Sequence, residues 1–193
     1  MNKLTGFSAL GALLLATGAF ADGPRTDQVV DRDVNQQERV EQGLQQGQLN
    51  TREAGQIERE ESRIDRTEAR DLKDGKLSPA EQAHINEMQN KTSRDIYRDR
   101  HNAAGGNPDS KSSERLQADV QRNVNQQQRI EQGGDNGTLT NREVGSLEAG
   151  QARTDRKEGV AAGDGHVGAG EQARIQRSDN HQSRRIHRKK ANS

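Results

Sequence analysis

The 193-residue chain repeats itself: sliding the sequence along itself by about ninety positions aligns its two halves without a gap. A run rich in Gly, Pro and Ser at 103–112 separates the copies and predicts a flexible linker. The duplication therefore predicts two structural units, at 26–102 and 113–193, built to one plan. The matching segments include 34–37 with 124–127, 41–43 with 131–133, and 81–83 with 171–173.

A shorter motif occurs twice in each copy and marks where helices begin. It is a Gly-x-Leu or Gly-x-Val step followed four residues later by a glutamate. Asn50, Ser78 and Thr140 each lie three residues before that glutamate, which is the spacing of a capping box. Pro79 falls at a first helical position, where a missing N–H is tolerated. Each step therefore predicts the start of a helix.

Glu, Gln, Arg and Ala fill the stretches between these steps, and all four favour helix. Apolar side chains recur there at helical spacing, as at Ile57 and Ile64. Each copy is expected to form three helices, in the first copy at about 30–43, 51–72 and 79–101. The expected fold class is all-α, with two tandem three-helix units and EF-hand-like helix-loop-helix turns, after a signal peptide.

Apolar residues are scarce, since only 27% of the chain is hydrophobic, and this excludes a large apolar core. The net charge is zero and both signs are finely mixed, which favours salt-bridged helices over an expanded coil. The chain has no Cys, so disulfides and thiolate metal sites are excluded. We expect the second copy to be looser, because Leu44, Ile64, Met88 and Tyr97 are replaced there by Gly134, Thr154, Ser178 and His187.

The amino terminus has the pattern of a signal peptide at 1–21. Lys3 supplies the positive start, 9–16 form a short apolar run, and Ala19-Phe20-Ala21 gives the small-x-small cleavage pattern. The apolar run is shorter than the roughly 20 residues that a membrane-spanning helix needs. We therefore expect an exported protein, periplasmic or secreted, that does not span the membrane.

Part of the second Gly-x-Leu step of each copy resembles the second half of an EF-hand calcium loop. Gly75, Leu77 and Glu81 match the sixth, eighth and twelfth positions of that loop. Its first and third positions should hold carboxylates, but here they hold Arg70 and Leu72. A tight turn followed by a capped helix explains the same residues without a metal, and we favour it.

If these loops do bind a cation, the EF-hand register gives the donors. The ion would be calcium, or zinc or copper. The side chains would come from both copies, with backbone carbonyls of the residue after each glycine assisting. The candidate metal residues are Asp74, Lys76, Glu81, Asp164, His166 and Glu171.

Three segments together resemble a group of short exported proteobacterial proteins of uncharacterised function. They are Arg-Ile-Glu-Gln-Gly at 129–133, the Gly-x-Leu-Thr-x-x-Glu step at 137–143, and Gln-Asn-x-x-Ser-Arg-x-Ile-Tyr at 89–97. The group consists of helical repeat proteins with degenerate EF-hand-like loops. The resemblance implies export and an all-helical fold, and it implies no particular activity.

Two further features are candidates for chemistry or contact. No two of the five histidines stand three or four residues apart, so we expect them to be exposed rather than metal ligands. The carboxyl-terminal end is strongly basic and could contact an envelope protein or an anionic surface. It has no interleaved aromatics, so no nucleic-acid partner is expected. Its cations are Arg184, Arg185, Arg188, Lys189 and Lys190.

The chain has no nucleophile constellation, and its many carboxylates are expected to be exposed, where they cannot act as tuned acids or bases. We therefore expect no enzyme. The sequence indicates an exported binding module that takes up divalent cations weakly through the degenerate loops. The alternative is a structural or stress-related envelope protein acting through helix–helix contacts without metal. A third hypothesis is a chain that stays largely disordered until it meets its partner.

Overall fold

A computed structural model describes residues 26–192, and within them the protein is all-α, with six α-helices and no strand. Two short 3₁₀ turns, η1 and η2, follow α2 and α5. The elements are α1 Thr26–Gln45, α2 Thr51–Asp71, η1 Leu72–Asp74, α3 Pro79–Arg100, α4 Lys111–Asp135, α5 Asn141–Ala161, η2 Ala162–Asp164 and α6 Ala169–Ala191.

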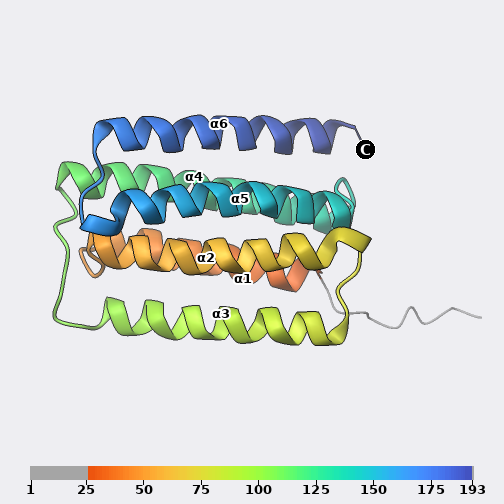
Figure 1. Cartoon of the computed structure of the whole chain (residues 1–193), viewed down its shortest axis with the longest axis horizontal. Coiled ribbons are helices and arrows are strands. Elements are labelled where there is room, and N and C mark those ends of the chain that lie inside the picture. The colour runs from red at the N-terminus through yellow and green to blue at the C-terminus, as the bar shows by residue number, and fades with distance from the viewer. Residues whose placement is uncertain (1–25, 193) are drawn as a thin grey trace, which may run out of the picture.

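The six helices lie side by side in layers (Figure 1). Helices α1, α2, α4 and α5 form the centre, α3 covers α1 and α2 on one side, and α6 covers α4 and α5 on the other. The largest interface joins α2 to α5, and the next joins α1 to α4. The most extensive contacts therefore form between helices from different halves of the sequence.

The predicted helix starts are confirmed at Asn50, Ser78 and Thr140, each of which forms a reciprocal capping box with the glutamate three residues later. These interactions satisfy backbone N–H groups that the first turn of a helix leaves unpaired. Gly75 and Gly165 precede two of the starts with φ of 89° and 90°, a left-handed conformation that glycine adopts without strain.

Helices α2 and α5 approach each other closely at both ends of their interface. A Cβ added to Gly55 would lie 2.5 Å from Cβ of Ala162, and one added to Gly145 would lie 2.7 Å from Cβ of Leu72. Each contact joins the start of one helix to the end of the other, so the two helices are antiparallel. Gly55 and Gly145 occupy equivalent positions in the sequence repeat, as do Leu72 and Ala162.

Apolar side chains gather in two buried clusters rather than in one core. One contains Leu49 and Val167, and the other contains Leu77 and Leu139, so each cluster joins Gly-x-Leu or Gly-x-Val steps from both halves. Helix α1 crosses from one to the other, with Val30 in the second cluster and Leu44 in the first. The part of the bundle between the two apolar clusters is therefore filled by polar side chains.

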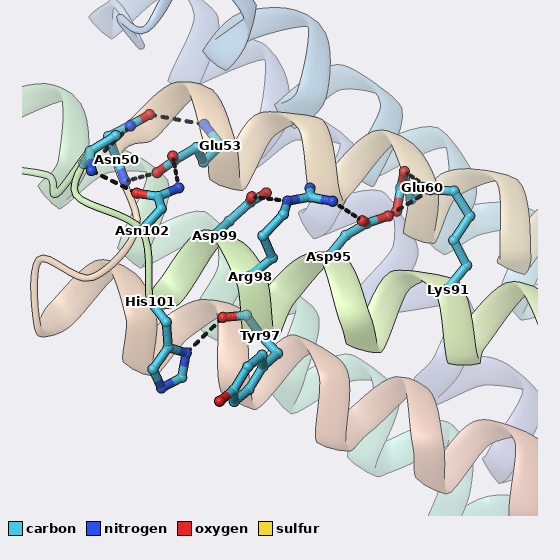
Figure 2. Close-up of polar contacts among 11 residues, drawn as sticks. Asn50, Glu53, Glu60, Lys91, Asp95, Tyr97, Arg98, Asp99, His101 and Asn102 are labelled. Atoms are coloured by element: carbon cyan, nitrogen blue, oxygen red, sulfur yellow. Dashed lines mark hydrogen bonds and ion pairs between the residues drawn. The ribbon is translucent and has the colours of Figure 1, made fainter.

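Not every apolar residue at helical spacing is buried. Ile57 and Ile64 are buried, as their spacing predicted. Tyr97, which we expected to contribute to burial, is instead 62% exposed and stacks on His101 (Figure 2). A helix can bury only one stripe, and on α3 that stripe is occupied by Ile85, Gln89, Thr92 and Ile96.

The amino terminus was predicted as a signal peptide and the segment 103–112 as a flexible linker. The predicted signal peptide at 1–21 lies outside the described residues. Among residues 26–192, no helix is long and apolar enough to cross a membrane. In the segment predicted as a linker, the N–H of Gly106 donates to the carbonyl of Gly47, and α4 begins at Lys111.

Candidate metal centre between the helices

The middle of the bundle is lined with acids from α2. Glu58, Glu61, Asp65 and Glu68 are spaced by three, four and three residues, which places them on one helix face. That face packs against α5, and none of the four side chains is more than 2% exposed. Our expectation that the carboxylates are exposed is therefore wrong for these residues. The reason is that α2 carries acids on the same face as Ile57 and Ile64.

The second copy repeats this arrangement on α5, ninety positions later. Glu148, Gln151, Asp155 and Glu158 occupy the equivalent positions, and they are equally buried. Only the second position differs, with an amide in place of a carboxylate. The acids of α2 and α5 therefore face each other across the largest interface of the molecule.

Helices α1 and α4 contribute Asp33 and three amides, Gln37, Asn123 and Gln127, to the same layer. Gln37 donates to Oε2 of Glu58, and Gln127 donates to Oε2 of Glu148, both at 3.1 Å. Asn123 donates to Oε2 of Glu158 at 2.7 Å. We call the set the carboxylate layer. It comprises Asp33, Gln37, Glu58, Glu61, Asp65, Glu68, Asn123, Gln127, Glu148, Gln151, Asp155 and Glu158.

Two groups of acids within the layer each bring three oxygens close enough together for one cation to bind. Cluster 1 consists of Asp33, Asp65 and Glu68, and cluster 2 consists of Glu58, Asp155 and Glu158. Each residue of a cluster offers one oxygen, and the three oxygens lie within 4.8 Å of one another. Calcium–oxygen distances of 2.3–2.6 Å, or somewhat shorter ones for smaller ions, fit such a group of ligands.

The two clusters are adjacent, and each contains residues that contact the other. Asp65 of cluster 1 and Asp155 of cluster 2 lie close enough to share a proton across the α2–α5 interface. Within the clusters, Asp33 faces Glu68 and Glu58 faces Glu158 in the same way. The arrangement is therefore that of one paired centre, not of two unrelated sites.

No buried cation of the described chain neutralises this layer. Among residues 26–192, none of the buried side chains belongs to Lys, Arg or His. Arg32 and Arg39, which interact with Asp33 and Glu61, are only partly buried. Arg122 and Lys157, which interact with Asp179, are exposed. A buried ionised carboxylate is very unfavourable without a partner, so the layer must either hold protons or bind cations.

Several oxygens of the layer receive no hydrogen bond from any donor among the described residues. Glu61 is 1% exposed and both of its carboxylate oxygens are in this state, although it lies between Asp33, Glu58 and Asp155. The amide oxygens of Gln37 and Gln127 are likewise buried without a donor. Buried polar atoms are nearly always satisfied in proteins, and these oxygens are free to accept a hydrogen bond from a protonated acid or to bind a cation.

Burial raises the pKa of the layer's acids. It raises the pKa of Asp33 and of Glu58 to about 7, and that of Glu148 to about 8. Burial, followed by repulsion from neighbouring acids, holds the pKa of Glu61 and of Asp65 well above the ordinary range. Without a cation, these groups retain protons near neutral pH.

The two clusters differ in their outer partners. Gln89 of α3 donates to Asp33 beside cluster 1, at 2.7 Å. In the second copy the equivalent pair is exchanged, because Asn123 stands for Asp33 and Asp179 of α6 stands for Gln89. Burial raises the pKa of Asp179 to about 7, and the pKa of nearby Asp119 on α4 to about 8. Cluster 2 therefore has two further buried acids near it, which help to raise the pKa of Glu158, whereas Asp33 of cluster 1 has the amide of Gln89 as its partner.

The metal residues predicted in the loops lie apart from this layer, at the surface. The carboxylates of Asp74 and Asp164 each accept the backbone N–H two residues later, from Lys76 and His166. Glu81 accepts the N–H of Ser78, and Glu171 accepts that of Gly168. All four carboxylates thus act in turns and helix caps, and the structure does not bring them together with the buried acids.

The other predicted surface features also lie outside the layer. The five histidines are all exposed: His84, His101, His166, His181 and His187. Of the basic carboxyl-terminal end, Arg184 and Arg188 are exposed, whereas Arg185 is partly buried and donates to Ser146 and Gln182.

The sequence contains a signal for the carboxylate layer that the predictions above left unused. The acids of α2 are repeated on α5 at three of four positions, while many charged surface positions differ between the copies. Charged residues are rarely buried, so a prediction based on apolar stripes assigns them to the surface. Their retention on the face that carries the apolar residues was the available indication.

Comparison with known proteins adds no further assignment: no family model, curated protein or solved structure matches the chain.

Proposed function

We propose that the protein binds divalent cations in the carboxylate layer, at two adjacent sites formed by clusters 1 and 2. The observation that carries this proposal is the burial of eight acids in the layer with no buried cation among the described residues beside them. Carboxylate and amide oxygens are ligands for hard cations such as Ca²⁺, Mg²⁺ and Mn²⁺. The absence of buried His and Cys among residues 26–192 makes Zn²⁺ and Cu²⁺ poorer candidates.

We further propose that the role is binding and not catalysis. Di-iron proteins of the ferritin-like type combine glutamates with Glu-x-x-His motifs inside a four-helix bundle. The buried positions of α2 and α5 contain no histidine, so a redox-inert cation suits this layer better. A saturable site with this composition fits a protein that stores, buffers or is stabilised by a divalent cation.

The setting we propose is the periplasm or cell exterior, on the basis of the signal-peptide pattern at 1–21. We also infer that two tandem three-helix units arose by duplication. The equal spacing supports this, because α5 begins ninety residues after α2 and α6 begins ninety residues after α3. In that history, the first unit supplies all three acids of cluster 1, and cluster 2 combines one acid of the first unit with two of the second.

Calorimetric titration tests the proposal. Protein stripped with a chelator is titrated at neutral pH with Mn²⁺, Ca²⁺, Mg²⁺ and Zn²⁺, and its thermal unfolding is followed in parallel. We expect saturable binding of at least one hard cation with up to two ions per chain. At a free concentration 100 times Kd, one site stabilises the folded state by about 2.7 kcal/mol.

Two double variants assign the site. In Asp65→Asn with Asp155→Asn, each cluster loses one negative charge while an amide oxygen stays in place, and we expect binding to be lost while the helical fold remains. In Glu81→Gln with Glu171→Gln, the loop carboxylates are neutralised, and we expect binding to be unchanged. If the loop variant alone abolishes binding, the cation site lies in the EF-hand-like loops.

Two results would overturn the proposal in different ways. Absence of heat and of thermal stabilisation with every cation would remove the binding function and favour the structural envelope role. Consumption of oxygen on addition of Fe²⁺, lost in the Asp65→Asn and Asp155→Asn variant, would show redox catalysis at the layer instead of binding alone.

A further inference from the structure

A groove on the outside of the second half runs between α5 and α6. Its volume is about 420 Å³, and Val160 and Ile175 contribute to an apolar floor. Val160 is 65% exposed, although its side chain is aliphatic. The one acid at the rim is Glu171, whose carboxylate already caps the start of α6. The rest of the rim is formed by cations from both helices: Arg153, Arg156, Lys157 and Arg174.

The cations of this rim are left without ion pairs. None of the four forms one with any residue in the described part of the chain. A second hollow of about 450 Å³ continues the rim along α6, past Arg177 and His181. Arg and Lys side chains that form no ion pair, around an exposed apolar floor, make a surface complementary to an anionic amphiphile.

The first half provides an internal comparison because it keeps only part of this charge. Arg63 and Arg66 stand at the places of Arg153 and Arg156, but Thr67 replaces Lys157 and His84 replaces Arg174. Helix α3 carries four cations and four acids, whereas α6 carries seven cations and two acids. At the position of Arg177, α3 has Glu87. Figure 2 shows that Lys91 of α3 is paired with Glu60 and Asp95, and that Arg98 is paired with Asp95 and Asp99. At the place of Val160 the first half has Arg70, which is paired with Asp71, so an exposed apolar residue surrounded by four cations without ion pairs is found in the second copy.

Two features together select the chemical class of the partner. Phosphate is bound well by arginine through paired N–H donors, and several arginines meet at this rim. A nucleic acid would also need aromatic side chains for stacking, but Tyr97 is the one aromatic among residues 26–192, and it lies on α3. The apolar floor has no role for a nucleic acid, whereas it can contact the first part of an acyl chain.

We propose that the α5–α6 groove binds anionic phospholipid at a membrane surface. The lipid phosphate lies between the arginines of the rim, and the beginning of the acyl chain contacts Val160. Arg184 and Arg188, which line a further hollow together with Arg129 and His181, add positive charge toward the carboxyl-terminal end of α6. This proposal is independent of cation binding, because it uses none of the residues in the carboxylate layer.

Vesicle co-sedimentation tests it with the whole protein. The vesicles are made of phosphatidylcholine alone, or of an equimolar mixture of phosphatidylcholine and phosphatidylglycerol. We expect binding to the mixed vesicles only. Arg153→Gln with Lys157→Gln and Arg174→Gln should weaken binding by roughly fivefold for each cation removed at low ionic strength. The matched control is Arg63→Gln with Arg66→Gln and Arg70→Gln, which removes three cations from the first half and should leave binding within about twofold.

A second variant separates lipid binding from simple charge attraction. Val160→Asn keeps every charge, so it should bind like the parent protein at low salt but lose the binding that persists at high salt. Circular dichroism of each variant shows that the fold is retained. Equal binding to neutral vesicles, equal loss in the first-half control, or stronger binding to heparin or DNA than to mixed vesicles would each overturn the proposal.

Discussion

At the scale of single residues, the structure depends on acids in places where most proteins have aliphatic side chains. Glu58, Asp65 and Glu68 occupy the buried face of α2, and their equivalents occupy that of α5. A buried acid without a counterion is stable only when it is protonated or when a cation binds it. The stability of this protein is therefore expected to respond to pH and to cations together.

We predict that the cation-free protein loses stability as pH rises. The pKa values of Asp33, Glu58 and Glu148 are raised by burial from 3.8 or 4.5 to about 7 or 8. Below the pKa of the unfolded chain, such an acid is protonated in both states and its contribution to stability is fully present. As pH rises through the folded pKa this contribution is lost, because the unfolded chain ionises more readily than the folded one. Each unit of displacement corresponds to about 1.4 kcal/mol, so a fall of several kcal/mol is expected between pH 4 and pH 8.

Urea unfolding at a series of pH values measures this slope. Glu61→Gln should flatten it and stabilise the cation-free protein at pH 8 by about 1 to 3 kcal/mol, because it removes a buried carboxyl group that the folded state must keep protonated while the unfolded chain ionises it. Asp109→Asn, at an exposed position between α3 and α4, should leave the slope unchanged. A parent protein whose stability rises from pH 4 to pH 8 in the absence of cations would contradict the prediction.

At the scale of helices, the starts were predictable and the partners were not. Asn50, Ser78 and Thr140 with their glutamates are local signals, and each marks a helix that begins where the sequence predicted. The contact of α2 with α5 depends on Gly55 and Gly145, and an isolated glycine in a helix does not show which helix approaches it. The burial of the acids on α2 could not be predicted either, because it follows from the contact with α5.

We predict that the α2–α5 contact does not tolerate larger side chains at these glycines. Gly55→Leu or Gly145→Leu would place new atoms against Ala162 or Leu72 and should destabilise the protein by about 1 to 3 kcal/mol. Thermal unfolding measures the effect. Gly170→Ala, where an added Cβ has open space, should instead raise stability by several tenths of a kcal/mol. Equal effects of the Leu and Ala substitutions would contradict close packing at the interface.

At the scale of the whole molecule, the two halves of the sequence form one shared interior, because α2 packs against α5 and α1 against α4. Both apolar clusters and both acid clusters take residues from each half or lie against the other half. The predicted all-helical fold is confirmed, but the sequence repeat contained no information on whether each copy could close a core alone.

We predict that residues 26–102 expressed alone do not form a stable monomer. The isolated segment would expose the face of α2 that carries Ile57, Glu58 and Gly55, which is buried against α5 in the whole protein. Circular dichroism at low protein concentration should show loss of cooperative unfolding, and sedimentation should show self-association at higher concentration. A monomer that unfolds cooperatively would show that each copy is an independent domain.

The glycine contacts at the two ends of α2 and α5 have a consequence for ion choice. Gly55 against Ala162 and Gly145 against Leu72 fix the distance between the two helix backbones. The buried acids lie between these two contacts. The space among the acids therefore cannot widen to accommodate a large cation. Because the α2–α5 separation is fixed by these glycine contacts, larger ions should fit less well. We therefore expect affinity among alkaline-earth ions to decrease with ionic radius from Ca²⁺ to Sr²⁺ and Ba²⁺.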